Sequence, residues 1–203
     1  METSKPEEKK YRYLYDSIEK TRKARIQAEK RLLSWDALAR HASVYYACWT
    51  TVLSIALIVI PTDVYLSAIA LAMATVTTMC TIYASSQNYG VRALQMQYSY
   101  LAMQKLLFDM DSQKALGIEN RVKIADEVGD KYNAILHQTE NHTTSDYTLS
   151  VYRANNSSSI SGNKTKTQFF NCAHIKLILF RLAVYGSPLV VLAVYTIAKH
   201  MVW

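Results

Sequence analysis

Two long stretches without a charged residue constrain the fold of this 203-residue chain more than any other feature of its sequence. Residues 42–60 are 19 uncharged, mostly apolar residues and residues 64–86 are another 23, with only residues 61–63 between them. A helix needs about 20 residues to cross the hydrocarbon layer of a bilayer. The two runs therefore predict a transmembrane helical hairpin, residues 42–86. The alternative is a pair of core helices in a soluble bundle, but the rest of the chain is too polar to cover both.

Composition and charge distribution predict the fold class and the orientation. Five Gly and three Pro make 8 of 203 residues, too few turn formers for a many-stranded β protein, so we expect an all-α membrane protein. Residues 1–41 carry eleven Lys or Arg against seven Asp or Glu, whereas the hairpin loop carries only Asp63. The positive-inside rule then places the N-terminus in the cytoplasm. Because the basic residues flank membrane helices, the net charge of +7 does not indicate specific nucleic-acid binding.

The segment before the hairpin, residues 1–41, has a heptad pattern. Mostly apolar or small side chains recur between residues 11 and 42 at alternating spacings of three and four, and Thr21 and Arg25 on the same seam weaken it as an autonomous coiled coil. Residues 4–7 supply a helix start, and one helix is expected to run from there into the first span. The predicted oligomer face of this coiled-coil-like helix consists of Leu14, Ile18, Leu32 and Trp35. The pattern is equally compatible with packing against other helices of the same chain.

Residues 87–140 are expected to form two cytoplasmic helices. The first, residues 89–110, has an apolar stripe made of Val91, Leu94, Tyr98, Leu101 and Phe108. The second, residues 118–137, has a stripe made of Ile118, Val122, Ala125, Val128, Tyr132 and Ile135. Gly90 is expected to mark a bend where the chain leaves the membrane, and Gly117 a break between the two helices. Together with the N-terminal helix, these stripes predict a small helical bundle below the membrane.

The last third of the chain divides into a polar and an apolar segment. Residues 141–175 are expected to be a flexible loop, because Ser, Thr and Asn make 15 of the 28 residues 141–168 and cannot bury enough apolar surface. Residues 176–203 are apolar, and their uncharged part, residues 182–198, has 17 residues, the lower limit for a span. We expect a third, C-terminal membrane helix there. The alternative is a helix in the membrane interface or docked on the bundle.

The sequence contains no phosphate-binding glycine loop, no metal-binding cysteine or histidine motif and no nucleophile motif. We therefore assign no catalytic, cofactor-binding or metal-binding residue and expect a protein that is not an enzyme. His137 and His142 flank Glu140, and Asp146 follows, so a metal or acid–base cluster can be drawn. The pattern is weak, because a spacing of five does not place two side chains on one helix face.

Within the spans, small and polar residues recur at helical spacing. They are Thr50, Ser54, Ser67, Ala74, Thr78, Thr81 and Ser85. Such residues let helices approach closely, so packing is one interpretation. The other is that they line a pore in an oligomer, and the two are compatible. Since neither span contains a charged residue, a proton relay or a voltage sensor is not expected.

Several short motifs together carry a family resemblance. Tyr89-Gly90-Val91-Arg92-Ala93-Leu94 follows the hairpin, and Tyr132-Asn133-Ala134-Ile135-Leu136 precedes Glu140-Asn141-His142 and Asp146-Tyr147. Over about residues 10–150 the chain resembles the SLATT family. These are bacterial membrane effectors found beside second-messenger nucleotide synthases, nucleotide-sensing domains or reverse transcriptases in anti-phage loci.

The resemblance implies a pore-forming effector of antiviral defence. It would oligomerise in the bacterial inner membrane and permeabilise it when an upstream sensor detects infection, causing growth arrest or cell death by abortive infection. The expected partners are the lipid bilayer, further copies of the chain, and a nucleotide second messenger or a sensor protein from the same locus. The candidate signal-sensing residues are Glu140, Asn141, His142 and Asp146. The alternative function is a non-conducting membrane adaptor whose cytoplasmic bundle recruits a partner protein.

Overall fold

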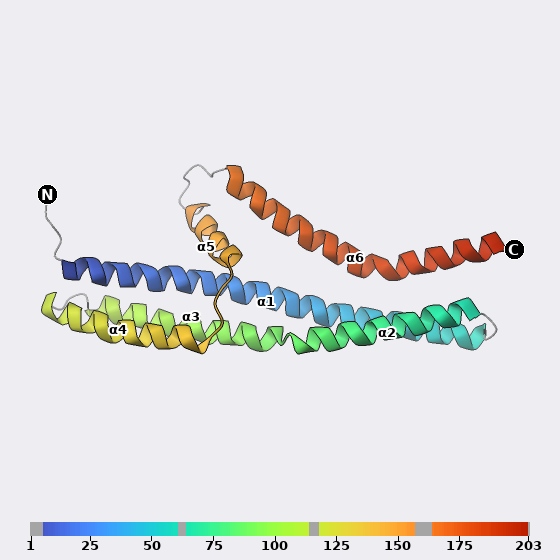
Figure 1. Cartoon of the computed structure of the whole chain (residues 1–203), viewed down its shortest axis with the longest axis horizontal. Helices are drawn as coiled ribbons and strands as arrows, with labels where there is room; N and C mark the ends of the chain where they lie inside the picture. The colour runs from blue at the N-terminus through green and yellow to red at the C-terminus, as the bar shows by residue number, and fades with distance from the viewer. Residues whose placement is uncertain (1–5, 61–63, 114–117, 157–163, 203) are drawn as a thin grey trace. The chain divides into compact units, whose positions relative to one another are not determined.

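The computed structural model describes residues 6–60, 64–113, 118–156 and 164–202, and the regular secondary structure in these ranges is helical (Figure 1). The helices are α1 (Pro6–Val59), α2 (Val64–Ser86), α3 (Tyr89–Ser112), α4 (Ile118–Gln138), α5 (Thr144–Asn156) and α6 (Lys164–Val202). The chain folds into two compact units. The first comprises Met1–Leu33 and Tyr89–Gly162, and the second Ser34–Asn88 and Asn163–Trp203. The all-α prediction is confirmed.

Helix α1 is continuous through both units (Figure 1). Its 54 residues are more than twice the number that a membrane span needs. Pro6 occupies the first helical position, where its missing N–H costs nothing, and neither Gly nor Pro occurs again before Pro61. The expected helix running from the N-terminal segment into the first span is therefore present.

The core of the first unit forms where α1, α3 and α4 pack together. One cluster joins Ile18 of α1 to Met103, Leu106, Leu107 and Met110 of α3 and Val128 of α4. A second joins Ala28 and Leu32 of α1 to Ala93 and Met96 of α3. Polar contacts tie the same helices, since the Tyr11 hydroxyl donates to the Met110 carbonyl at 2.6 Å and the hydroxyls of Thr21 and Tyr132 lie 2.7 Å apart. The predicted cytoplasmic bundle corresponds to this unit.

Helix α3 buries a different face from the one that the sequence predicts. The predicted stripe is exposed along its whole length, with Val91 56%, Leu94 46%, Tyr98 65%, Leu101 46% and Phe108 71% accessible. The core face instead carries Met96, Met103 and Met110, all fully buried. Both faces are apolar with heptad spacing, so periodicity could not decide between them. Methionine fills the inner face because its unbranched side chain adapts to irregular gaps between helices.

The heptad seam of α1 packs within the chain. Ile18 and Leu32, two residues of the predicted oligomer face, have no exposed surface and contact α3, and Leu14 lies against the same core. Trp35 is half-buried in the second unit. Because Ile18 and Leu32 are already covered, they are not available to a second copy. The intramolecular alternative is the correct one for these two positions.

One local prediction after the hairpin needs correction. The break between α2 and α3 centres on Asn88, which has a positive φ of 48°, rather than on Gly90, which lies inside α3. Asn tolerates this left-handed conformation better than most residues. Of the predicted stripe of α4, Ala125 and Val128 are buried, and Tyr132 and Ile135 pack against the same core. The side chains of Ile118 and Val122 lie outside the described residues. The predicted break at Gly117 lies outside the described residues.

The predicted loop 141–175 contains helical structure. Helix α5 occupies Thr144–Asn156, and α6 begins at Lys164. The composition argument was wrong for α5 because it considered only apolar burial. Polar contacts with α1, described below, hold this helix in place.

The second unit contains the hairpin of α1 and α2. Leu53, Leu66 and Met73 form its buried cluster. One stretch of α1 and one stretch within Val64–Ser112 are long and apolar enough to span a membrane, and only 6% and 11% of these stretches are buried in the molecule. Core helices of a soluble protein would be mostly buried. The low burial therefore argues against the soluble-bundle alternative.

Helix α6 packs on the hairpin at a point where proline interrupts its hydrogen bonding. Pro188 lies buried inside α6 and has no N–H to donate to the carbonyl of Val184, four residues earlier. The Tyr46 hydroxyl of α1 donates to this carbonyl at 2.7 Å, and the Ser187 hydroxyl donates to it at 3.1 Å. The neighbouring Tyr45 hydroxyl donates to the Tyr185 carbonyl at 2.8 Å. Two tyrosines of α1 thus bind backbone carbonyls beside the proline, as an apolar environment requires.

The apolar part of α6, Arg181–Ile197, is shorter than the two candidate spans. Its residues Leu192 and Tyr195 pack against the hairpin cluster. The described residues thus contain two helices that meet the length and hydropathy of a span, and a shorter apolar helix docked beside them. A bilayer crossing by residues 176–203 stays a prediction.

We predict that Tyr46→Phe weakens the attachment of α6 by about 1 kcal/mol, because the Val184 carbonyl loses the shorter of its two side-chain hydrogen bonds and keeps only the one from Ser187. Pro188→Ala restores an N–H to Val184, so Tyr46→Phe should cost less in that background. The measurement is a double-mutant cycle of thermal unfolding in detergent, with Tyr65→Phe as an exposed control. Equal costs of Tyr46→Phe in both backgrounds would contradict the assigned role.

Candidate functional site

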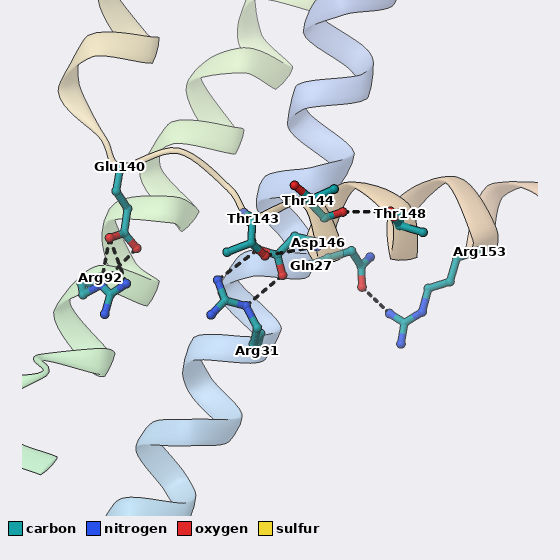
Figure 2. A network of polar contacts seen from close by, with 9 residues as sticks. All are labelled: Gln27, Arg31, Arg92, Glu140, Thr143, Thr144, Asp146, Thr148 and Arg153. Carbon is teal, nitrogen blue, oxygen red and sulfur yellow. Dashed lines mark hydrogen bonds and ion pairs between the residues drawn. The ribbon is translucent and has the colours of Figure 1, made fainter. Parts of the chain in front are cut away.

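The candidate site is a polar cluster in the first unit, where α5 contacts α1 and the connector before α5 contacts α3 (Figure 2). It begins with a reciprocal cap at the N-terminus of α5. The Thr143 N–H and hydroxyl donate to Asp146 Oδ2 at 3.0 and 2.8 Å, and the Asp146 N–H donates to Thr143 Oγ1 at 3.4 Å. This is the capping-box arrangement with Asp in place of Glu. It gives a short polar segment a defined helix start.

Asp146 also connects α5 to α1. The Arg31 guanidinium donates to both carboxylate oxygens, from Nε at 2.9 Å and from Nη2 at 3.0 Å. The Asp146 side chain is only 3% exposed. Burial by itself would raise the pKa of Asp146, but the hydrogen bonds from Arg31 and Thr143 outweigh it and lower the pKa below its ordinary value. The carboxylate is therefore charged, and removing either partner would leave a poorly compensated buried charge.

Two more contacts hold the same region (Figure 2). Arg92 of α3 donates from Nε to both oxygens of Glu140 at 3.0 Å, and its Nη2 lies 3.0 Å from Oε2. Arg153 of α5 donates to the Gln27 side-chain oxygen of α1 at 2.6 Å. The connector from α4 to α5 is thus attached to α3 through Glu140, and α5 is attached to α1 at its first and third turns.

A buried cation lies near this cluster. Arg25 of α1 has no exposed surface and donates from Nη1 to the Ser99 hydroxyl of α3. Its Nε and Nη2 have no hydrogen-bond partner in the described part of the chain. Burial lowers the pKa of Arg25 from its ordinary value, but an arginine stays protonated at physiological pH. The guanidinium is therefore a buried positive charge without a carboxylate among the described residues.

The pKa of His142 is lowered by burial and by this charge. Its Nδ1 is buried and has no partner among the described residues, and its ring lies 6.3 Å from that of Tyr147. Burial, followed by repulsion from Arg25, lowers the pKa of His142, while Asp146 opposes the shift. A neutral imidazole is therefore favoured at this position.

The structure brings together three of the four predicted signal-sensing residues. Glu140, His142 and Asp146 lie at the connector and face α1 or α3, whereas Asn141 is exposed. The metal alternative finds no support in the described residues, where no three His, Cys, Asp or Glu side chains gather suitably. Glu140 and Asp146 are instead bound by arginines. A signal-sensing role stays a prediction for all four residues.

The sequence did not reveal the partners Gln27, Arg31, Arg92 and Arg153. One local signal was available, because Thr143-Thr144-Ser145-Asp146 has the spacing of a capping box and predicts a helix start. The arginine pairs have no comparable local signal. Arg31 and Asp146 are 115 residues apart in the sequence.

In the second unit, the predicted pore-lining or packing residues remain largely uncovered. Ser54, Ser67, Ala74, Thr78, Thr81 and Ser85 are exposed, and Thr50 is half-buried. The hydroxyls of Thr50, Ser54, Thr78 and Thr81 each donate to a carbonyl of the preceding helical turn at 2.8 or 2.9 Å. Packing between α1 and α2 uses Leu53, Leu66 and Met73 instead.

These features define a helical membrane protein with a two-helix apolar hairpin and a separate polar bundle. The chain matches the model of the SMODS and SLOG-associating 2TM effector domain family 5 over residues 7–195, and it belongs to that family. Family members carry a two-span effector domain associated with defence systems, in agreement with the resemblance to SLATT proteins. Comparison with curated proteins and with solved structures finds no match.

We predict that acidification from about pH 7.5 to about pH 5.5 destabilises the first unit through His142. Because its pKa is lowered on folding, the unfolded chain binds a proton below the ordinary histidine pKa of about 6.5 before the folded chain does. The lowered pKa of Asp146 acts at a more acidic pH, near or below about 4. The melting temperature of the detergent-solubilised protein should fall over this range. His142→Gln should flatten the slope and the exposed control His137→Gln should keep it, whereas equal slopes in all three proteins would contradict the assignment.

Proposed function

We propose that this protein oligomerises in the bacterial inner membrane and permeabilises it in response to an infection signal, without catalysing a reaction. The N-terminus and the first unit face the cytoplasm in this proposal. The signal is a nucleotide second messenger or a sensor protein from the same locus, and the result is growth arrest or cell death. Membership of a two-span effector family supports this function class.

The observation that carries the proposal is the exposed hydroxyl stripe of α2. Ser67, Thr78 and Thr81 lie beside the buried face formed by Leu66 and Met73, but they are not covered by α1 or α6. Two helices enclose no lumen, so water can cross only where several copies turn such stripes toward one another. The Leu, Ile and Met side chains elsewhere on α2 then face lipid. A wall of hydroxyls without charge would select weakly among small ions and dissipate the membrane potential.

The exposed face of α3 supports self-association. Val91, Leu94, Tyr98, Leu101 and Phe108 recur at spacings of three, four, three and seven, which is the a/d pattern of a coiled-coil seam. Copies anchored in one membrane with the same topology present this seam in the same direction. Confinement to a membrane also raises their effective concentration, so a short seam suffices. We therefore assign the seam to contact with a second copy of the chain, in place of the buried Ile18 and Leu32.

The first test targets the α3 seam. Leu101→Glu should reduce co-purification of differently tagged copies at least about tenfold, because an apolar side chain worth about 1.5–3 kcal/mol on burial is replaced by a charge. The exposed neighbour Gln104→Glu, which lies off the seam, is the matched control. Undiminished co-purification of Leu101→Glu would assign the seam to another partner.

The second test targets the hydroxyl stripe. Expression of the wild-type protein in bacteria should depolarise the membrane, as read by a potential-sensitive dye. Replacing Thr78 and Thr81 together by Leu should abolish depolarisation while oligomers persist. Val76→Leu with Met79→Leu, on the opposite exposed side of α2, should leave depolarisation intact.

Two results would count against the pore. Full depolarisation by the Thr78 and Thr81 variant would move the lining to Thr50 and Ser54 or to α6. A wild-type protein that forms oligomers and never depolarises the membrane would favour the non-conducting adaptor.

A further inference from the structure

A pocket of about 350 Å³ lies on the first unit between α3 and α4. Its lining consists of Gln95, Tyr98, Ser99, Ala102, Ile135, Gln138 and Thr139. All of these side chains are neutral, and five carry hydrogen-bonding groups. The volume is in the range of small-molecule sites and exceeds what a bare phosphate ion fills. The lining therefore combines an apolar surface with several hydrogen-bonding groups, and it contains no carboxylate that would repel an anion.

The buried guanidinium of Arg25 lies directly behind this lining. Arg25 donates from Nη1 to the hydroxyl of Ser99, and Ser99 belongs to the pocket. Two other nitrogens of the same guanidinium have no partner in the described part of the chain. The ion pairs among the described residues involve other arginines, including Arg31 and Arg92. A positive charge is thus held next to the pocket without a counter-ion.

An uncompensated buried charge is among the most costly features of a folded protein. An apolar residue of similar length would avoid this cost, so the presence of the charge needs a reason. An anion in the pocket would provide one. The hydroxyl of Ser99 accepts a hydrogen bond from Arg25 and still has its own proton, which it can donate to a ligand in the pocket.

The remaining lining favours an organic anion over an inorganic one. Ala102 and Ile135 give the lining an apolar surface that an organic group can contact. The amides of Gln95 and Gln138 offer both donors and acceptors. We propose that this pocket binds a small phosphate ester, with Arg25 as the counter-charge and Ser99 as the direct donor. Because a nucleotide second messenger is a phosphate ester, this inference rests on the proposed signal, but its binding test does not depend on membrane permeabilisation.

The test measures ligand-dependent stabilisation of the full-length protein in phosphatidylcholine nanodiscs. The probes are AMP, inorganic phosphate and uncharged adenosine. AMP should raise the melting temperature the most, phosphate should raise it less, and adenosine should leave it unchanged. A second arm replaces the soluble probes by phosphatidylglycerol in the nanodisc, which distinguishes a lipid headgroup from a soluble phosphate as the source.

Arg25→Met is the diagnostic variant. Without ligand it should be at least as stable as the wild type, because the uncompensated charge is gone. It should bind the probe at least about tenfold more weakly, because a charge-assisted interaction is lost. Ser99→Ala should weaken binding as well, while Lys123→Met, which removes an exposed positive charge from α4, should leave binding unchanged.

Three results would overturn the proposal. One is the absence of stabilisation by every phosphate-containing probe in both arms. Another is equal stabilisation of the wild type and Arg25→Met, which would place the anion elsewhere. The third is a strong loss of ligand-free stability in Arg25→Met, since the guanidinium would then already be compensated within the fold.

Discussion

Polar groups that leave water need partners, and this requirement governs both units of the protein. In the second unit, Pro188 removes a helical donor, and Tyr46 of α1 supplies its hydroxyl to the free carbonyl of Val184. In the first unit, the buried carboxylate of Asp146 accepts hydrogen bonds from Arg31 and Thr143. Helix α1 provides partners in both places. The continuity of this helix therefore matters as much as its apolar surface, because α5 and α6 each attach to it through polar contacts.

Helix α3 has two apolar faces, and only one of them is buried in the core of the first unit. Its inner face, with Met96, Met103 and Met110, closes the core against α1 and α4. On its outer face, Tyr98 and Phe108 are 65% and 71% exposed among the described residues. Large apolar patches on a soluble surface usually mark an interaction site. A fold stabilised by one face can thus keep the other for association without losing its own core.

The polar cluster at α5 was predictable only in part. The sequence singles out Glu140, His142 and Asp146, and the spacing of Thr143 and Asp146 contains a helix start. Their partners could not be found in this way, because Arg31 and Arg92 are 115 and 48 residues away from the acids that they bind. A local pattern reports which side chains lie on one helix face. It does not report which distant charge will be brought opposite to them.

The sequence by itself determined the helical class, the two uncharged spans and the continuous helix that leads into the first span. Length and the lack of charge suffice for a span, because the bilayer imposes one thickness and forbids unpaired backbone groups. Only the tertiary structure decided which stripe of α3 is buried, that Ile18 and Leu32 pack within the chain, and that residues 144–156 are helical. Each of these outcomes depends on a neighbouring helix. Periodicity places residues on a common face, but the shape and charge of the neighbour select the face that is covered.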